Sequence, residues 1–286
     1  MKRIYLLLIV IFTMFFLTTG CVKKDNMQNI NIITSSYPTE FLVDSLYGDN
    51  SKVENIFPDG ETIDEYEFNE KQYKMYSSKD LFVYNGSNAS DIALELSNRN
   101  KELLLIDSTK GMKKIYGTEE LWLDPSNMLM MAKNIKNGLE EYVTNKLLIE
   151  EIDKNYNKLK VSISELDASY KVSAENADYK TIVVGNESLK YLEKYNLNVI
   201  VLNDEALEKT YLEVRKLIAN GTIKNIYIFN QHDINDNIQN LITNYKLKPV
   251  TLYRLDSITD LQRDSKKNYI TIMNENLDLL KTELYK

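Results

Sequence analysis

The single cysteine of the chain, Cys21, is the first residue for which the sequence predicts a chemical role. It ends the segment LTTGC (residues 17–21), which follows an apolar stretch (4–17) and two basic residues, Lys2 and Arg3. This pattern predicts a lipoprotein signal peptide over residues 1–20, with lipid attached to Cys21 after cleavage. The alternative is an uncleaved anchor, although the apolar stretch is shorter than the about 20 residues of a spanning helix. In both cases we expect the rest of the chain on the extracytoplasmic face of the cell membrane.

The only histidine, His232, lies just beyond an expected strand that ends at Phe229. A structural metal site needs several ligands and a catalytic histidine needs partners, so we interpret a lone histidine as a solvated or core residue. The sequence contains no Gly-x-Ser-x-Gly elbow, no phosphate-binding glycine-rich loop and no His-Glu-x-x-His motif. One cysteine also excludes an intramolecular disulfide and a zinc finger. These features favour a binding protein over an enzyme.

The charge balance argues against a nucleic-acid partner. The chain has 42 acidic and 35 basic side chains, for a net charge of −7. Binding to phosphate backbones depends on concentrated positive charge, which this composition does not provide. We expect a monomer whose membrane contact is the lipid on Cys21.

The elements that must position any site alternate between short apolar runs and longer segments of helical period. Strands are expected at 30–35, 52–57, 81–84, 103–106, 181–184, 199–202, 226–229 and 249–253. Helices are expected at 40–47, 91–99, 126–141, 144–174, 188–195, 205–220, 235–245 and 268–284. This alternation predicts an α/β fold with mostly parallel sheets, and ligands in such folds bind beyond the carboxyl ends of the strands.

The long segment 144–174 divides the chain into two similar sets of elements. We predict a signal peptide (1–20), a tether (21–29), an N-terminal lobe (30–142), a linking helix (143–175) and a C-terminal lobe (176–286). The linking helix would be more than about 40 Å long at 1.5 Å per residue, so it would run the length of both lobes. We expect a ligand site in the cleft between them.

Several motifs in order resemble the zinc- and manganese-binding receptors of ABC importers. The most specific are KDLFVYNG (79–86), LWLDP (121–125) and NYITIMNENL (268–277); FPDG (57–60), DEYE (64–67) and KYLEKY (190–195) are weaker. The resemblance covers nearly the whole mature chain. It implies a rigid two-lobed lipoprotein that delivers a divalent metal ion, zinc or manganese, to a membrane permease and its ATPase.

The resemblance also implies four metal ligands, and here the chain departs from the family. The family's first two histidines correspond to Asp64 and Glu120. The third position falls on Asn186, with Glu187 as the alternative if the alignment slips by one residue. The fourth, an aspartate in the family, corresponds to Asp256. No family histidine is retained.

A site made of these four side chains would contain only oxygen donors. Carboxylate and amide oxygens suit magnesium, calcium or manganese, whereas imidazole favours zinc. Three carboxylates in one cleft repel one another unless a positive charge compensates them. That charge would be a hard metal ion, or a side chain such as Arg254 or a nearby lysine that replaces the metal.

Three functions are consistent with this sequence. The first is a substrate-binding lipoprotein that captures a divalent cation for an ABC importer. The second is a surface adhesin or interaction lipoprotein that keeps the fold and has lost metal binding. The third is a receptor whose cleft takes a small organic solute.

Overall fold

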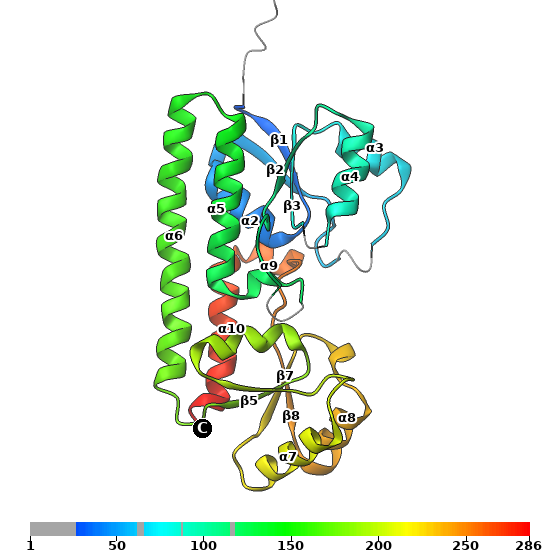
Figure 1. Ribbon diagram of the computed structural model, residues 1–286, viewed down its shortest axis with the longest axis vertical. Coiled ribbons are helices and arrows are strands. Elements are labelled where there is room, and N and C mark those ends of the chain that lie inside the picture. Colours follow the sequence, from blue (N-terminus) through cyan, green and yellow to red (C-terminus); the bar gives the residue numbers. More distant parts are fainter. Residues whose placement is uncertain (1–26, 62–65, 87, 115–117) are drawn as a thin grey trace, which may run out of the picture.

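The computed structural model describes residues 27–61, 66–86, 88–114 and 118–286, which form two lobes along one axis (Figure 1). Each lobe contains a four-stranded parallel sheet, with strand orders β2-β1-β3-β4 and β6-β5-β7-β8. The strands are β1 (Ile30–Thr34), β2 (Ser51–Asn55), β3 (Leu81–Tyr84), β4 (Leu104–Asp107), β5 (Thr181–Val184), β6 (Asn198–Val201), β7 (Asn225–Ile228) and β8 (Lys248–Thr251). The expected α/β fold with parallel sheets is therefore confirmed.

Helices flank both sheets (Figure 1). The α-helices are α2 (Tyr37–Tyr47), α3 (Glu70–Ser77), α4 (Ser90–Arg99), α5 (Pro125–Tyr142), α6 (Lys146–Glu175), α7 (Glu208–Ala219), α8 (Asp236–Tyr245), α9 (Asp260–Asp264) and α10 (Tyr269–Leu284). The 3₁₀-helices are η1 (Gly48–Asn50), η2 (Leu121–Leu123), η3 (Glu187–Tyr195) and η4 (Gln231–Asp233). Within the described part of the chain, no helix has the length and apolar character to cross a membrane.

The inner strands are apolar on both faces, as expected for sheets covered by helices on two sides. Ile32 and Ile33 of β1 are fully buried, and Ile32 pairs with Leu81 of β3. In the second sheet, Val183 and Val184 of β5 are likewise fully buried. Burial of this kind fixes the strand order, because edge strands expose one side.

The long helix α6 runs beside both lobes (Figure 1). It has 30 residues, which corresponds to a length of about 45 Å. The Asn145 side chain caps its first turn by accepting a hydrogen bond from the Leu147 amide at 3.0 Å. Its buried stripe, which includes Leu148, Ile163 and Tyr170, packs against α5, α2 and α10. One helix thus contributes to the cores of both halves.

The expected strands agree with the structure more closely than the expected helices do. All eight strands are present within two residues of their expected bounds. The segment expected as a helix over 188–195 is the 3₁₀-helix η3, and the short helices α3 and α9 were not predicted.

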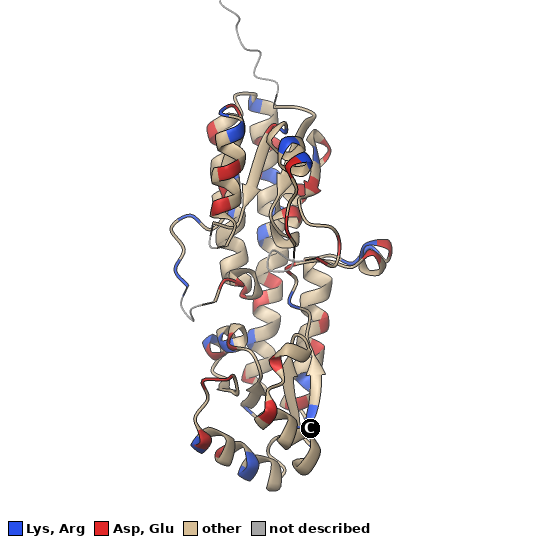
Figure 2. Cartoon of the chain, turned by 90° about the vertical axis from the view of Figure 1, so that its right-hand side faces the viewer, with Lys and Arg blue, Asp and Glu red and all other residues tan. Residues whose placement is uncertain are grey.

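Acidic and basic side chains are interspersed along both lobes (Figure 2).

Candidate functional site

Two of the predicted site carboxylates, Glu120 and Asp256, contact the same guanidinium. Arg254 Nη1 lies 3.9 Å from Glu120 Oε1, and Arg254 Nη2 forms an ion pair with Asp256 Oδ2. Glu120 precedes η2, whereas Asp256 lies between β8 and α9, so residues far apart in the sequence meet here. The three side chains are 20–23% exposed. This Glu120–Arg254–Asp256 group is called the cleft triad below.

The backbone around Arg254 is held by two contacts. The indole Nε1 of the buried Trp122 donates a hydrogen bond to the Arg254 carbonyl at 2.8 Å. The Tyr37 amide donates to the Asp256 carbonyl at 3.1 Å. Between them, Leu255 is buried with a φ of +67°, a left-handed conformation that is rare for a branched residue and persists only where its surroundings impose it. The triad therefore rests on a fixed turn.

Asn186 follows β5 and caps η3 with its side chain. Its Oδ1 accepts a hydrogen bond from the Ser188 amide at 3.0 Å, and its Nδ2 donates to Asp233 Oδ1 at 2.9 Å. The Ser188 hydroxyl in turn donates to Glu120 Oε2 at 2.8 Å. Asn186 is thus connected to the cleft triad through Ser188, while its own amide atoms already have partners.

The remaining candidate residues lie apart from the triad or outside the described part. Asp64 lies outside the described residues. Glu187 and His232 line a separate cavity of about 180 Å³, together with Asn186 and Asp233. His232 is exposed on η4, as expected for a solvated histidine.

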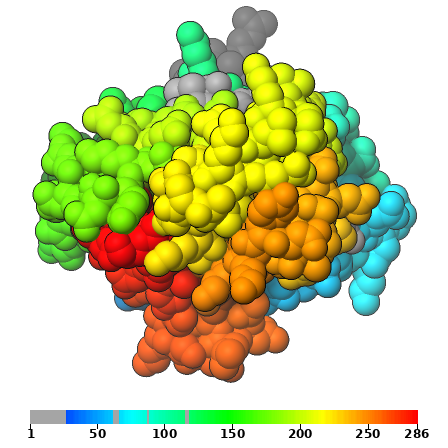
Figure 3. Space-filling view, turned by 90° about the horizontal axis from the view of Figure 1, so that it is seen from below, coloured from blue at the N-terminus to red at the C-terminus, as the bar shows by residue number. Residues whose placement is uncertain are grey.

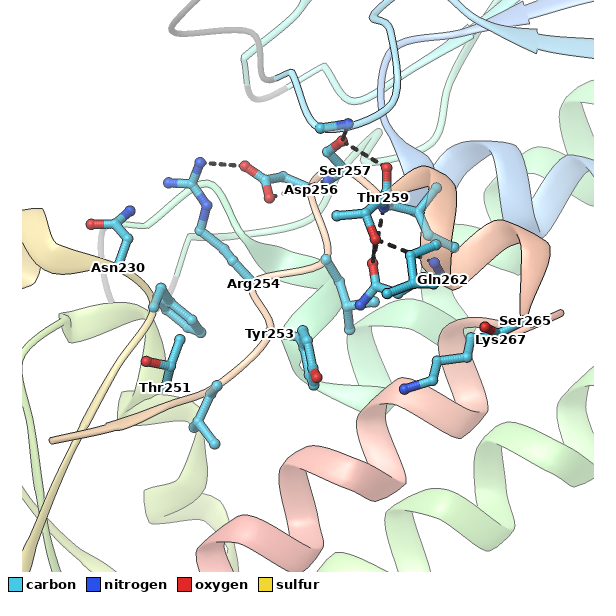
Figure 4. Close-up of a pocket in the computed structure, with 16 residues that line it drawn as sticks. Asn230, Thr251, Tyr253, Arg254, Asp256, Ser257, Thr259, Gln262, Ser265 and Lys267 are labelled. Atoms are coloured by element: carbon cyan, nitrogen blue, oxygen red, sulfur yellow. Dashed lines mark hydrogen bonds and ion pairs between the residues drawn. The ribbon is translucent and has the colours of Figure 1, made fainter.

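A larger cavity of about 590 Å³ opens beside Arg254 (Figure 4). It lies between the end of β8 and the segment that carries α9 and leads to α10. Its polar lining includes Arg254, Asp256, Gln262 and Lys267, and Tyr253 forms part of its wall. Lys267 is paired with Glu275 at 2.8 Å.

The two carboxylates of the triad have the charge to bind a cation. They are already paired with one, the Arg254 guanidinium. Among the residues that the structure describes, no group of three or more His, Cys, Asp or Glu side chains is placed to hold a metal ion. An ion that bound Glu120 and Asp256 would have to share their oxygens with Arg254 or displace it.

The sequence predicted that Glu120 and Asp256 lie near each other and named Arg254 as a compensating charge, and the structure brings these three side chains together; the sequence did not indicate Ser188. The motif Asn186-Glu187-Ser188 indicates a helix cap, which the structure contains. No sequence signal could indicate that the Ser188 hydroxyl reaches Glu120, because 68 residues separate the two.

A second polar contact joins the segment after β8 to the N-terminal lobe. Arg263 on α9 binds Glu40 of α2, with Nη1 to Oε1 at 2.7 Å. It also binds Asp59, with Nε to Oδ2 at 2.6 Å and Nη2 to Oδ1 at 2.7 Å. The Gly60 amide donates to the Ser257 hydroxyl at 2.8 Å and to the Ile258 carbonyl at 3.0 Å. This set of contacts is called the α9 latch below.

A family model described as the periplasmic component A of the zinc-uptake complex matches residues 32–283. The zinc-binding lipoprotein AdcA of Streptococcus pneumoniae is 24% identical over a gapped alignment of 309 positions, which covers 98% of this chain and 61% of AdcA. This chain therefore spans about three fifths of that relative. The high-affinity zinc uptake system protein ZnuA of Bacillus subtilis is 22% identical, with 97% of each chain covered.

Solved structures share the fold. The Zn(II)-bound ZnuA-like domain of S. pneumoniae AdcA has a TM-score of 0.75 at 23% identity, covering 90% of this chain and 100% of that domain. The metal-dependent lipoprotein YcdH of B. subtilis has a TM-score of 0.76 at 20% identity, with the same coverage.

Proposed function

Because this chain belongs to the family of the periplasmic zinc-uptake component A, we propose that it is the substrate-binding lipoprotein of a divalent-cation ABC importer. It captures the ion in the cleft between its lobes and delivers it to a membrane permease and its ATPase. The observation that carries this proposal is the family match, which runs through both lobes from residue 32 to residue 283.

The described site supports a cation as the captured substrate. Glu120 and Asp256 converge from separate parts of the chain, and their charges attract a cation into a partly buried cleft. We propose that Asp64 and Asn186 complete the ligand set. Asn186 would have to give up at least one of its present hydrogen bonds to do so.

Two arguments bear on which ion the protein captures, and they favour different ions. The relatives AdcA and ZnuA are named for zinc, which favours zinc or manganese as the substrate. The oxygen donors of this chain favour a harder ion than histidines would. We propose that discrimination between zinc and manganese is weaker here than in a histidine-containing site.

The location and assembly form part of the same proposal. Lipid on Cys21 holds the protein at the extracytoplasmic face of the membrane, where a monomer presents both lobes to the permease. The protein carries out no catalysis, because its task is capture and release.

The test is a calorimetric titration of the chain without residues 1–21, which retains every described element, with zinc, manganese, magnesium and calcium. We expect saturable binding of at least one ion, lost in Asp64→Ala and in Asp256→Ala. Glu213→Ala, which removes an exposed carboxylate from α7, is the matched control and should bind as the parent does. Absence of binding by the parent to all four ions would overturn the proposal.

A further inference from the structure

Arg254 places a fixed positive charge between the two carboxylates that the proposed function assigns to the captured ion. We propose that Arg254 is a built-in counter-ion of the cleft, which competes with the incoming divalent cation for Glu120 and Asp256 and thereby sets the affinity of the site. This inference rests on the proposed function. It assigns to Arg254 a role in specificity rather than in ligation.

The geometry suits a guanidinium better than any other side chain. Its two terminal nitrogens face carboxylates on two segments, Nη1 toward Glu120 and Nη2 toward Asp256. A guanidinium is planar, offers several donors in a fixed fork and stays charged at all physiological pH values. Competition by Arg254 is therefore independent of pH, unlike competition by protons.

Contacts of the main chain, and not only of the side chain, hold Arg254 in position. The Trp122 indole holds the Arg254 carbonyl, and the next residue, Leu255, is locked in a left-handed conformation. Because the main chain is fixed from the Arg254 carbonyl onward, the guanidinium starts within reach of both carboxylates. The contacts are thus a property of the fold.

The structure also provides space for displacement. Arg254 lines the cavity of about 590 Å³ beside the triad, and Figure 4 shows its side chain at the edge of this cavity. When a divalent ion binds the carboxylates, the guanidinium can move into this space without a change in the backbone. Ion binding then breaks the contacts of Arg254 with Glu120 and Asp256. A cation that the carboxylates attract only weakly cannot compensate for this loss and does not bind.

Removing the guanidinium while keeping a polar side chain tests the competition. Arg254→Gln in the chain without residues 1–21 is titrated with zinc chloride and with manganese chloride, beside the parent chain. We expect the association constant for at least one ion to rise about tenfold, the equivalent of one lost charged hydrogen bond. Arg215→Gln removes a positive charge from α7 of the same lobe and should change the constant less than twofold.

A second pair of variants separates competition from a general effect on the fold. Glu120→Gln combined with Arg254→Gln should lose the gain, because one of the contested carboxylates is gone. Arg254→Lys retains the charge on a compact ammonium that cannot offer two forked contacts, so we expect an intermediate constant. Metal-induced increases in the unfolding temperature should follow the same order.

The outcomes distinguish this inference from the proposed function. Ion binding by Arg254→Gln but not by the parent would support the counter-ion role and overturn capture by the natural chain. Equal binding by both, lost in Asp256→Ala, would overturn the counter-ion role and leave the proposed function intact. If neither chain bound any ion, both proposals would be wrong.

Discussion

At the scale of single residues, Ser188 supports the cleft through a contact that the sequence does not indicate. Its side chain is buried and its hydroxyl holds Glu120 Oε2 at 2.8 Å. Ser188→Ala should lower the free energy of unfolding by about 1 kcal/mol, the usual value of one hydrogen bond. It should also weaken ion binding severalfold, because Glu120 loses its orientation.

Chemical denaturation and metal titration of Ser188→Ala provide the measurement. The control is Ser169→Ala on the exposed side of α6, where the hydroxyl donates only to the Glu165 carbonyl of its own helix. If both serine variants bound the ion as the parent does, Glu120 would not need Ser188 for its position.

Asp44 on α2 makes stability depend on pH. Partial loss of hydration at its carboxyl, together with the charge of Glu40, raises the pKa of Asp44 to about 6 from 3.8, although the residue remains exposed. A carboxyl with a raised pKa in the folded state binds protons more tightly there than in the unfolded chain. The resulting penalty is absent below pH 3.8, grows as the pH rises to about 6 and is complete above that value.

Asp44→Asn should therefore stabilise the protein above pH 6 and leave its stability unchanged near pH 3.8. Because the Asp44 side chain reaches solvent, we expect a gain of at most about 1 kcal/mol. Thermal unfolding at pH 4 and pH 7.5 measures it, and an equal gain at both values would contradict the assignment.

The candidate site could be predicted in part from single residues. The motif LWLDP identified Glu120, two residues before the tryptophan, and Leu255-Asp256-Ser257 identified Asp256. The sequence did not show whether Asn186 caps a helix or binds a metal ion, because the side-chain oxygen of asparagine can do either. In the structure it caps η3. A contact such as Arg254 to Glu120 depends on the packing of two lobes, which no local pattern encodes.

At the scale of elements, buried strands were easy to predict and short helices were not. Runs such as Thr181–Val184 are apolar and β-branched, so pattern and burial agree. Helix α3 was missed because it has only 8 residues and buries only Tyr76 and Ser77. In η3 the buried residues Ser188, Tyr191, Leu192 and Tyr195 have the i, i+3, i+4, i+7 spacing of an α-helix, so the pattern could not indicate that this segment is a 3₁₀-helix.

The contact between α5 and β4 depends on Gly138. A Cβ at this position would lie 2.9 Å from both Cγ1 and Cγ2 of Ile106, closer than packed carbons tolerate. Gly138→Ala should therefore lower the free energy of unfolding by about 1 to 3 kcal/mol, although alanine alone favours a helix.

Urea unfolding measures the effect of Gly138→Ala, and a second substitution tests its cause. Ile106→Ala removes Cγ1, Cγ2 and Cδ1, so the double variant with Gly138→Ala should lose less stability than the sum of the two single variants. Asn137→Ala, at the exposed neighbouring position of α5, is the control and should not destabilise. Additive effects of the two core substitutions would show that no steric conflict exists.

At the scale of the whole molecule, α6 and the α9 latch connect the two lobes at different places. We propose that the lobes comprise residues 30–142 and 176–286, with 143–175 as the link. Helix α6 contributes to both cores, in agreement with the expected linking helix that runs the length of both lobes. The α9 latch was not predicted, because it depends on Arg263 meeting two carboxylates that are 223 and 204 residues away.

The α9 segment projects from the body of the molecule, as the orange region in Figure 3 shows, so it needs its own attachment. Arg263 supplies this attachment by pairing with Asp59 and with Glu40, whose side chain is only 8% exposed. Removing the guanidinium would leave Glu40 buried without its cation.

Arg263→Gln should thus lower the free energy of unfolding by about 2 kcal/mol and speed hydrogen exchange in residues 257–264. Arg99→Gln is the matched control: Arg99 also pairs with two carboxylates, Glu70 and Glu95, but within the N-terminal lobe and at the surface, where we expect a much smaller effect. Hydrogen exchange followed by mass spectrometry compares the two variants. Faster exchange confined to 257–264 in Arg263→Gln alone would support a latch between the lobes, whereas unchanged exchange would mean that the Gly60 contacts hold α9 without Arg263.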